Sequence, residues 1–303
     1  IILLRLNNLR QVTMRDITYI DKFREGLQNF HKSSDVGIMG ILNVTPDSFY
    51  DGGVNLSVKA AIASGLKMKR DGADIIDIGG ASSRPGSQSI SAAEEWSRVE
   101  PVIHGLLDSA PEMNISIDTY RAEVARKAVE AGAVLINDIS AGSLDPELLY
   151  AAGEADVPYV LMHMSGRPDN MQIDPGYVDV VSEVKAWFKV KIAELSEAGV
   201  KDLILDPGFG FGKRQEDNYA LLNNLCEFSE LDLPILVGIS RKSMIYNALD
   251  CQPSEALNGT TVNHAWAIER GASLLRVHDV LEAREVVVLH HHLCNVKSIE
   301  KEK

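Results

Sequence analysis

Leu203-Ile-Leu-Asp-Pro-Gly-Phe-Gly-Phe-Gly-Lys213 is the stretch of sequence from which the fold of this chain can be predicted. Its first three residues are aliphatic, which is typical of a strand buried on both faces in a parallel sheet. Pro207 and Gly208 end that strand and leave the carboxylate of Asp206 at its last position. A charge buried there is costly unless a partner compensates it. Other apolar runs in the chain end in the same way, on a polar residue followed by a loop with Gly or Pro.

From Gly37 onward the sequence repeats a unit of buried strand, loop and amphipathic helix. We predict eight strands, over residues 38–43, 75–78, 114–118, 134–137, 159–162, 203–206, 235–239 and 274–277. The helices between them are expected at about 57–71, 91–107, 122–131, 146–155, 177–198, 218–228, 255–270 and from 281 onward. The second of these begins at Ser91-Ala-Ala-Glu94, which is a capping box.

Eight such units with short connections favour a closed barrel, because an open doubly wound sheet would fit five or six. We therefore predict an α/β protein in which residues 37–303 form a single-domain TIM (β/α)8 barrel. Residues 1–36 are an N-terminal extension of uncertain structure.

Composition and net charge exclude some classes of binding partner. The 303 residues carry a net charge of −13 and the sequence pI is about 5.1, which argues against nucleic acid or an anionic membrane. Cys226, Cys251 and Cys294 form no CxxC pair, so neither a disulfide framework nor a zinc site is expected, and a cytoplasmic location fits. No apolar run is long enough to span a membrane, and Ile1–Leu6 lacks the basic start of a signal peptide.

Four polar residues stand at the ends of the predicted third, fourth, sixth and seventh strands. They are Asp118, Asn137, Asp206 and Lys242. In a barrel the loops after the strands form the active-site face. A carboxylate accepts two parallel hydrogen bonds from an amidine-like edge, and an amide both donates and accepts, so this set suits a flat polar heterocycle. The alternative is a structural cluster of salt bridges that closes the top of the barrel.

Three cationic or ionisable side chains, Arg84, Arg276 and His278, are expected on the same face, and they suggest a pocket for phosphate or diphosphate. The alternative is that they are surface cations. Asn43, with Asp47 or Asp51 in the loop that follows it, could hold one Mg2+ bridging the phosphate oxygens. Asn and Asp also simply favour turns, which is the alternative there.

The glycine-rich segment after Asp206 fits neither GxGxxG nor GxxxxGK[ST], so no nucleotide loop is predicted. Its glycines are expected to let the backbone approach a ligand, with Phe211 as an aromatic wall.

Seven motifs, in order and at strand ends, give about residues 37–285 a close resemblance to the dihydropteroate synthase family. They are Met39-Gly-Ile-Leu-Asn-Val-Thr-Pro-Asp-Ser-Phe49, Asp77-Ile-Gly-Gly80, Ser116-Ile-Asp-Thr119, Asn137-Asp-Ile-Ser140, Asp206-Pro-Gly-Phe-Gly-Phe-Gly-Lys213, Gly238-Ile-Ser-Arg-Lys-Ser243 and Arg276-Val-His-Asp-Val280. The resemblance implies an enzyme that joins 6-hydroxymethyl-7,8-dihydropterin diphosphate to p-aminobenzoate, giving 7,8-dihydropteroate and diphosphate.

The resemblance also implies a role for each matching residue. The pterin pocket is expected at Asp118, Asn137, Asp206 and Lys242. The diphosphate site is expected at Asn43, Arg84, Arg276 and His278, with Mg2+ held by Asn43 and Asp51. The p-aminobenzoate end is expected at Ser83, Pro85, Phe211 and Ser240, together with Lys242. The chain departs from the family where the second loop usually reads Gly-Gly-Glu-Ser-Thr-Arg-Pro-Gly, since Ala81 replaces the Glu and Ser83 the Thr.

An SN1-like substitution is expected because the arylamine is already neutral at pH 7 and the difficult step is the departure of a charged diphosphate. Mg2+, Arg276 and His278 would stabilise that charge, and Asp118 a cation at the pterin methylene carbon. With Lys242, these are the expected catalytic residues. The alternatives are a catalytically impaired pterin-binding paralogue, suggested by Ala81, and a pterin-dependent methyltransferase.

The last predicted helix carries Val286-Val-Val-Leu289, which is more apolar than a solvent-facing helix needs. A homodimer through the last helices is therefore expected, the alternative being that these residues cover the outer wall of the barrel.

Overall fold

The computed structural model describes residues 17–33, 35–45, 53–81, 90–166 and 176–295. Its eight strands are all parallel and lie side by side in the order β6-β5-β4-β3-β2-β1-β8-β7. They are β1 (Gly37–Asn43), β2 (Ile75–Gly79), β3 (Asn114–Asp118), β4 (Leu135–Asp138), β5 (Tyr159–Met162), β6 (Leu203–Asp206), β7 (Leu236–Val237) and β8 (Leu274–Val277). A bridge between Leu205 and Ile235 joins β6 to the start of the β7 segment and closes the ring. The predicted (β/α)8 barrel is confirmed.

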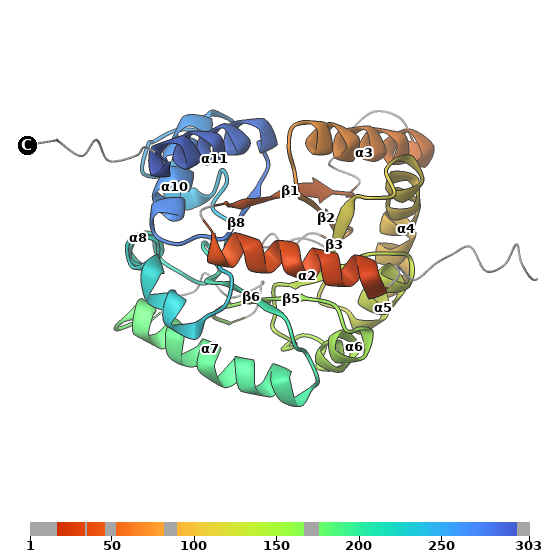
Figure 1. The fold of residues 1–303 in the computed structure, drawn as a ribbon, viewed down its shortest axis with the longest axis horizontal. Coiled ribbons are helices and arrows are strands. Elements are labelled where there is room, and N and C mark those ends of the chain that lie inside the picture. Colours follow the sequence, from red (N-terminus) through yellow and green to blue (C-terminus); the bar gives the residue numbers. More distant parts are fainter. Residues whose placement is uncertain (1–16, 34, 46–52, 82–89, 167–175, 296–303) are drawn as a thin grey trace, which may run out of the picture.

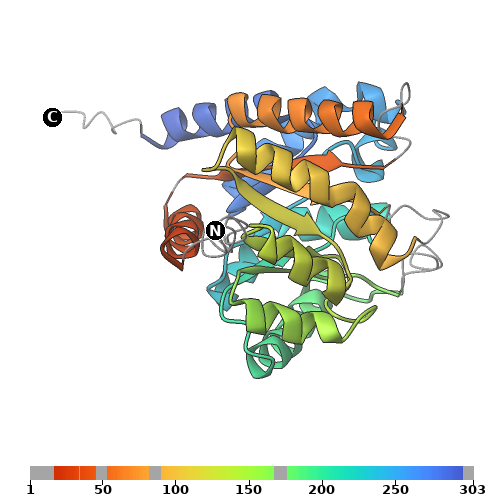
Figure 2. The same cartoon turned by 90° about the vertical axis from the view of Figure 1, so that its right-hand side faces the viewer.

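Helices surround the strands, as Figures 1 and 2 show. Those that follow the strands are α3 (Gly53–Arg70), α4 (Ala92–Ser109), α5 (Ala122–Glu130), α6 (Glu147–Ala155), α7 (Val180–Glu197), α8 (Gln215–Asn223), α9 (Ser243–Tyr246), α10 (Leu257–Glu269) and α11 (Val280–Cys294). Two 3-10 helices, η2 (Leu225–Leu231) and η3 (Pro253–Glu255), complete the connections. Ser91 caps α4, because its side chain accepts a hydrogen bond from the N–H of Glu94, but the Glu94 carboxylate binds Arg98 Nη2 at 2.6 Å and no complete capping box forms.

Two boundaries differ from the predicted ones for identifiable reasons. The seventh strand is shorter than the predicted 235–239, because the N–H of Lys242 donates to the carbonyl of Ile239 in a turn that takes the backbone out of the sheet. Helix α8 begins before the predicted residue 218, where the Asp217 carboxylate accepts hydrogen bonds from the main-chain N–H of Arg214 at 2.8 Å and from Arg214 Nε at 2.9 Å. The short helix α9, which follows the turn after β7, was not predicted.

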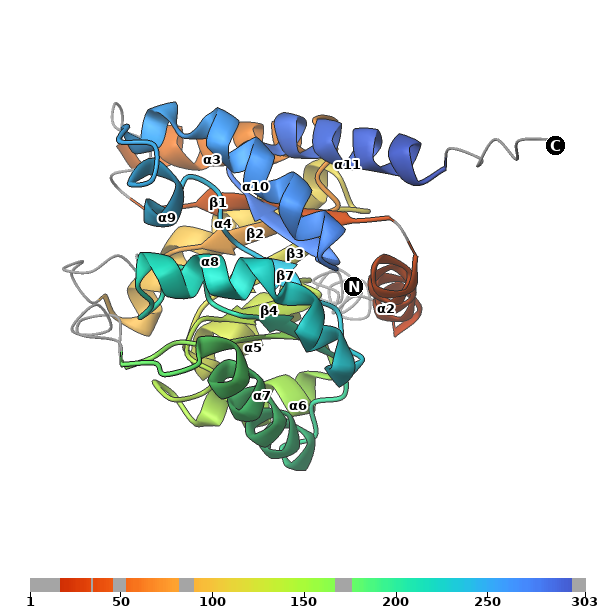
Figure 3. The same ribbon diagram turned by 90° about the vertical axis from the view of Figure 1, so that its left-hand side faces the viewer.

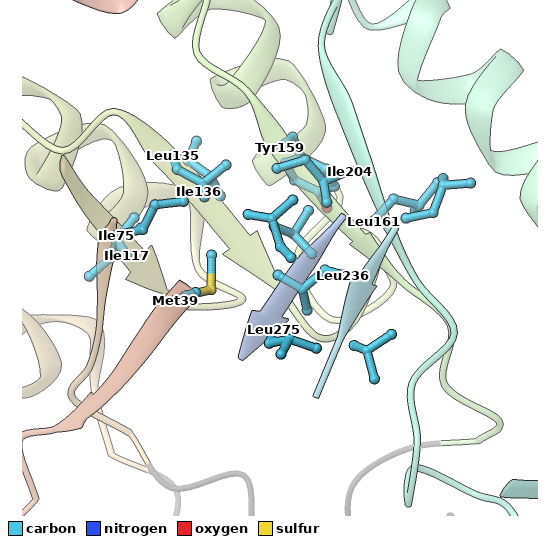
Figure 4. Close-up of a cluster of buried hydrophobic side chains, with 14 of the residues drawn as sticks. Met39, Ile75, Ile117, Leu135, Ile136, Tyr159, Leu161, Ile204, Leu236 and Leu275 are labelled. Atoms are coloured by element: carbon cyan, nitrogen blue, oxygen red, sulfur yellow. The ribbon is translucent and has the colours of Figure 1, made fainter. Parts of the chain in front are cut away.

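Apolar side chains from all eight strands, on both faces of the barrel wall, form one buried hydrophobic core, with Met39, Ile117, Tyr159 and Leu275 among them (Figure 4). These residues are almost fully buried. Strands buried on both faces explain why the sequence shows continuous aliphatic runs rather than alternation.

The N-terminal extension contains a helix, α2 (Ile17–Lys32), that lies across the end of the barrel where the strands begin (Figures 1 and 3). Ile20, Phe23 and Leu27 are buried and join the main hydrophobic core. Arg24 donates to Asp202, just before β6, at 2.7 Å. We call this end of the barrel the base and the opposite end, where the strands finish, the rim. Within the described residues, no helix is long and apolar enough to cross a membrane.

Candidate active site

The rim contains a buried network of charges centred on Asp77, the third residue of β2. One of its carboxylate oxygens, Oδ2, accepts hydrogen bonds from Arg276 Nε at 2.7 Å and Asn137 Nδ2 at 2.8 Å. Arg276 Nη2 donates to Asp118 Oδ2, also at 2.7 Å. Four strands, β2, β3, β4 and β8, therefore place these side chains against one another.

The network changes the ionisation of its members. Burial raises the pKa of Asp118 to about 7, although the nearby Arg276 opposes this shift. Burial works against the charge of Arg276 as well, but the carboxylates of Asp77 and Asp118 raise its pKa above the ordinary value. Arg276 therefore keeps its charge, while Asp118 changes its protonation near neutral pH.

Asp206 and Lys242 lie on the other side of the same opening. A Cβ placed on Gly238 would stand 3.8 Å from Lys242 Nζ and 4.0 Å from Asp206 Oδ2, so both groups face one point. Burial lowers the pKa of Lys242 to about 8, with Asp206 opposing the shift. Asp206 Oδ1 accepts a hydrogen bond from the N–H of Gly208 at 2.7 Å. The carboxylate at the end of β6 thus has the partners that its burial requires.

The glycine-rich loop after β6 wraps around Lys242. Lys242 Nζ donates to the carbonyl of Phe209 at 2.6 Å and lies 4.7 Å from the centre of the Phe211 ring, a cation–π contact. Gly208, Gly210 and Gly212 have φ of 70°, 80° and 63°. This left-handed conformation requires glycine at these positions.

Gly208 does not have the role predicted for these glycines. Its backbone lies against the backbone of His163 and does not face an open ligand site. A Cβ there would overlap the His163 carbonyl oxygen. Lys213 is buried below the loop, where Nζ lies 3.0 Å from His163 Nδ1 and donates to the carbonyls of Gly208 and Phe211 at 2.9 and 3.1 Å. The loop is therefore built around a buried amine.

His278 and Ser240 bring the loops after β8 and β7 together. The N–H of His278 donates to Ser240 Oγ at 3.2 Å. Burial and the neighbouring charge of Arg276 lower the pKa of His278 to about 4. The imidazole is therefore neutral at pH 7 and can donate a hydrogen bond without adding a charge.

Of the residues predicted to bind Mg2+, Asn43 is the one that the structure describes. A Cβ on Gly79 would stand 3.6 Å from Asn43 Oδ1 and 3.5 Å from Asp118 Oδ2, so the amide oxygen faces the mouth beside the charge network. An amide oxygen suits Mg2+, which usually takes one or two protein ligands and fills its remaining positions with water and substrate phosphates. No group of three His, Cys, Asp or Glu side chains in the described part of the chain could hold a metal by itself. Asn43 therefore fits a metal shared with a phosphate ligand.

Several predicted site residues fall outside the described ranges. They are Asp47, Asp51, Ser83, Arg84 and Pro85. The other predicted residues meet at the rim as described above.

The loop with the Ala81 substitution is held at both described ends by arginines of other elements. Arg98 Nη1 donates to the carbonyl of Gly80 at 2.9 Å, and Arg121 Nη2 donates to the carbonyl of Ile90 at 2.6 Å. Arg121 also forms an ion pair with Glu95, which is fully buried. These contacts hold the described residues on either side of 82–89 and use no carboxylate at position 81.

Two features of the site were missed by sequence reasoning. The role of Asp77 is one, although a carboxylate within the apolar run Ile75-Ile-Asp-Ile78 indicates a charge that needs a buried partner. The burial of Lys213 against His163 is the other, and nothing in the sequence indicates it.

The assembled site offers an amide, two carboxylates and an amine around one opening, with a fixed guanidinium and a neutral imidazole beside them. Such a set can bind the donor and acceptor edge of a flat heterocycle and stabilise an anionic group next to it. Ion pairs with Asp77 and Asp118 orient the guanidinium of Arg276.

Comparison with known proteins places these observations in a family. The family model described as "Pterin binding enzyme" matches residues 39–278. The dihydropteroate synthase of Escherichia coli strain K12 is 47% identical over 252 residues, which are 82% of this chain and 89% of that protein.

Solved structures give the same result. The Xanthomonas albilineans dihydropteroate synthase with 4-aminobenzoic acid is similar with a TM-score of 0.82 and 42% identity, over 87% of this chain and 94% of that one. The Yersinia pestis dihydropteroate synthase in a sulfonamide drug complex is similar with a TM-score of 0.81 and 41% identity, over 87% and 96% of the two chains.

Proposed function

This chain belongs to the pterin-binding enzyme family, and we propose that it carries out the dihydropteroate synthase reaction by a dissociative, SN1-like route. The chain is an enzyme of folate biosynthesis, a transferase that condenses 6-hydroxymethyl-7,8-dihydropterin diphosphate with p-aminobenzoate. The relatives at this level of identity are synthases. Neither the methyltransferase nor the impaired paralogue has a comparable observation in its favour.

In this proposal the pterin ring binds at Asp118, Asn137, Asp206 and Lys242. The observation that carries it is the buried network in which Asp77 holds both Asn137 and Arg276, because the network fixes an amide and a guanidinium at one opening. Preorganised groups of this kind need no rearrangement when charge develops in the transition state.

The diphosphate would lie against Arg276 and His278, with Arg84 beside them. Arg276 uses Nε and Nη2 for Asp77 and Asp118, and no hydrogen bond from Nη1 is found to the described residues. That leaves one edge of a fixed, charged guanidinium for a phosphate oxygen. Neutral His278 would add a hydrogen bond to the leaving group.

We propose that Asn43 holds Mg2+, with Asp51 as the second protein ligand. When bound, the ion would neutralise charge on the diphosphate and so assist its departure. The Asn43 amide oxygen faces the mouth beside Asp118, which supports this role for Asn43.

After the diphosphate leaves, the ionised form of Asp118 would stabilise a cation at the pterin methylene carbon. The amine nitrogen of p-aminobenzoate would then form the new C–N bond and lose a proton. Its ring would lie near Phe211 and Ser240, and Ser83 and Pro85 are the other residues proposed to bind it. Support comes from the Phe211 ring at Lys242 and from Ser240 at the His278 main chain.

Diphosphate release tests the activity directly. The purified chain is incubated with the pterin diphosphate and p-aminobenzoate, with and without Mg2+, and with a sulfonamide as competitor. We expect release that depends on Mg2+ and is reduced by the sulfonamide. No release with both substrates and Mg2+ would contradict the assignment.

A second experiment separates the two routes of substitution. Pterin diphosphate and Mg2+ are supplied without the arylamine, and diphosphate is measured over a single turnover. The dissociative route expects release without p-aminobenzoate. Release that begins only when the arylamine is added would instead indicate direct displacement.

We also propose that two copies of the chain associate through α10 and α11. In α11, Val286 and Val287 are buried against the barrel, as the alternative reading expected, whereas Leu289 and Leu293 are 69% and 67% exposed. Trp266 of α10 is 46% exposed. Sedimentation of the purified chain should give a dimer, and L289E/L293E should shift it to a monomer.

We also propose a cytoplasmic location, which is supported by the free thiols of the cysteines.

A further inference from the structure

Arg241, in the loop between β7 and α9, forms a two-point ion pair with Asp279, which directly precedes α11. Nε lies 2.8 Å from Oδ2, and Nη2 lies 3.0 Å from Oδ1. Arg241 Nη1 donates to the carbonyls of Pro253 and Ser254 at 2.9 and 2.6 Å. Its main-chain N–H donates to Thr260 Oγ1 at 3.1 Å. We call the ion pair the Arg241–Asp279 clamp.

Arg241 lacks the backbone conformation usual for its residue type, and Asp279 lacks the hydrogen bonds usual for its position. Arg241 has φ of 53°, in the left-handed region that residues with a Cβ avoid. Asp279 occupies the N-cap position of α11, where Asp ordinarily accepts hydrogen bonds from the first turn, yet its side chain makes no such bond. Both of its oxygens are bound to Arg241 instead. Strain of this kind persists only where surrounding contacts enforce it, and it concentrates at functional sites.

The clamp joins the two loops that carry opposite ends of the proposed site. Arg241 stands between Ser240 and Lys242, and Asp279 follows His278. Where the loops meet, the N–H of His278 donates to Ser240 Oγ. Any change in the clamp would therefore move Lys242 and Ser240 relative to His278.

We propose that Arg241 and Asp279 are positioning residues for the reaction. The clamp sets the spacing between the loop that presents Lys242 and Ser240 to the pterin and arylamine and the loop that presents His278 to the diphosphate. This proposal rests on the proposed function. A small misplacement of reacting groups lowers rates strongly, so loss of the clamp should reduce kcat/KM roughly 10- to 100-fold.

Three variants test the clamp. D279N and R241K each remove the two-point ion pair but preserve size or charge, and both should lower kcat and raise KM for p-aminobenzoate. Loss of folded protein lowers the apparent kcat but leaves KM unchanged, so the KM shift distinguishes positioning from stability. R241G removes the clamp and also removes the strain of the left-handed conformation, which glycine adopts freely. It should be as impaired as R241K although its backbone is unstrained.

The matched control is D202N, which removes a carboxylate from Arg24 at the base. That pair has a similar contact distance of 2.7 Å, and its side chains are 21% and 30% exposed, compared with 23% and 20% in the clamp. D202N should keep wild-type kcat and KM. Wild-type kinetics in D279N and R241K, full activity in R241G, or failure of both clamp variants to fold while D202N folds would each overturn the proposal. An inactive wild-type enzyme would instead contradict the proposed function.

Discussion

The rim and the base of this barrel are made by the same eight strands, but charged side chains are buried at the rim and partly exposed at the base. At the rim, Asp77 and Asp206 are buried, and burial shifts the pKa of Asp118 and Lys242 toward neutrality. At the base, Arg24 forms ion pairs that remain partly exposed to solvent.

The difference follows from what covers each end. Helix α2 closes the base with Ile20, Phe23 and Leu27, so apolar contacts hold that end together. At the rim, no described helix plays this part, and charged side chains meet one another instead. Buried charges contribute little net stability, but they are preorganised for binding and catalysis. We therefore expect changes at the rim to alter activity and changes at the base to leave activity unchanged.

The largest effect is expected for R276A. It removes the cation between Asp77 and Asp118 and the proposed diphosphate contact, so kcat should fall about 100- to 1,000-fold. A pterin without the diphosphate should still bind, and calorimetry with such a ligand provides the control. Equal loss of binding by both ligands would count against the division of the site into pterin and diphosphate parts.

Alanine substitutions at two glycines with left-handed backbones, one at the rim and one at the base, allow a direct comparison of the two ends of the barrel. Gly208 at the rim has φ of 70° and no room for a Cβ, whereas Gly271 at the base has φ of 95° and open space around that position. G208A should lower the free energy of unfolding by about 3 kcal/mol and disturb Lys242, while G271A should cost about 1 kcal/mol and leave activity unchanged. Urea unfolding and kcat/KM measure both. Similar losses for the two variants would mean that the crowding at Gly208 is relieved by movement of the loop.

Sequence patterns predicted the strands well because burial on both faces produces continuous aliphatic runs that end in Gly or Pro. They also placed Asp118, Asn137, Asp206 and Lys242 at one end, since parallel strands finish on the same side of a barrel. The role of Asp77 was not predictable in this way, because Arg276 lies 199 positions away in the chain. The seventh strand was predicted but is shorter than expected, since the backbone turns at Arg241, whose left-handed conformation no residue type indicates.

The pH dependence of kcat/KM should report the buried charges at the rim. Asp118 must be ionised to stabilise a cation, so activity should rise as pH increases through about 7. Lys242 must be protonated to donate to the pterin, so activity should fall as pH increases through about 8. The resulting bell has its maximum at about pH 7.5, and at pH 6 the rate should be roughly a sixth of that maximum. D118N should lower activity and abolish the rising limb, and a rising limb that persists in D118N would assign it to another group.

The smallest effect is expected for D202N at the base. Its partner Arg24 keeps contacts with Asp21 and Asp156, and exposed ion pairs of this kind contribute little, so the free energy of unfolding should change by no more than about 1 kcal/mol. Thermal unfolding at low and high salt measures the change, which salt should reduce further. D279N breaks a two-point ion pair of similar solvent exposure at the rim and should cost a similar amount of stability. Because only D279N lies between groups assigned to the reaction, only it should alter kcat/KM, and a kinetic defect in D202N would show that the base and the rim are coupled through the strands.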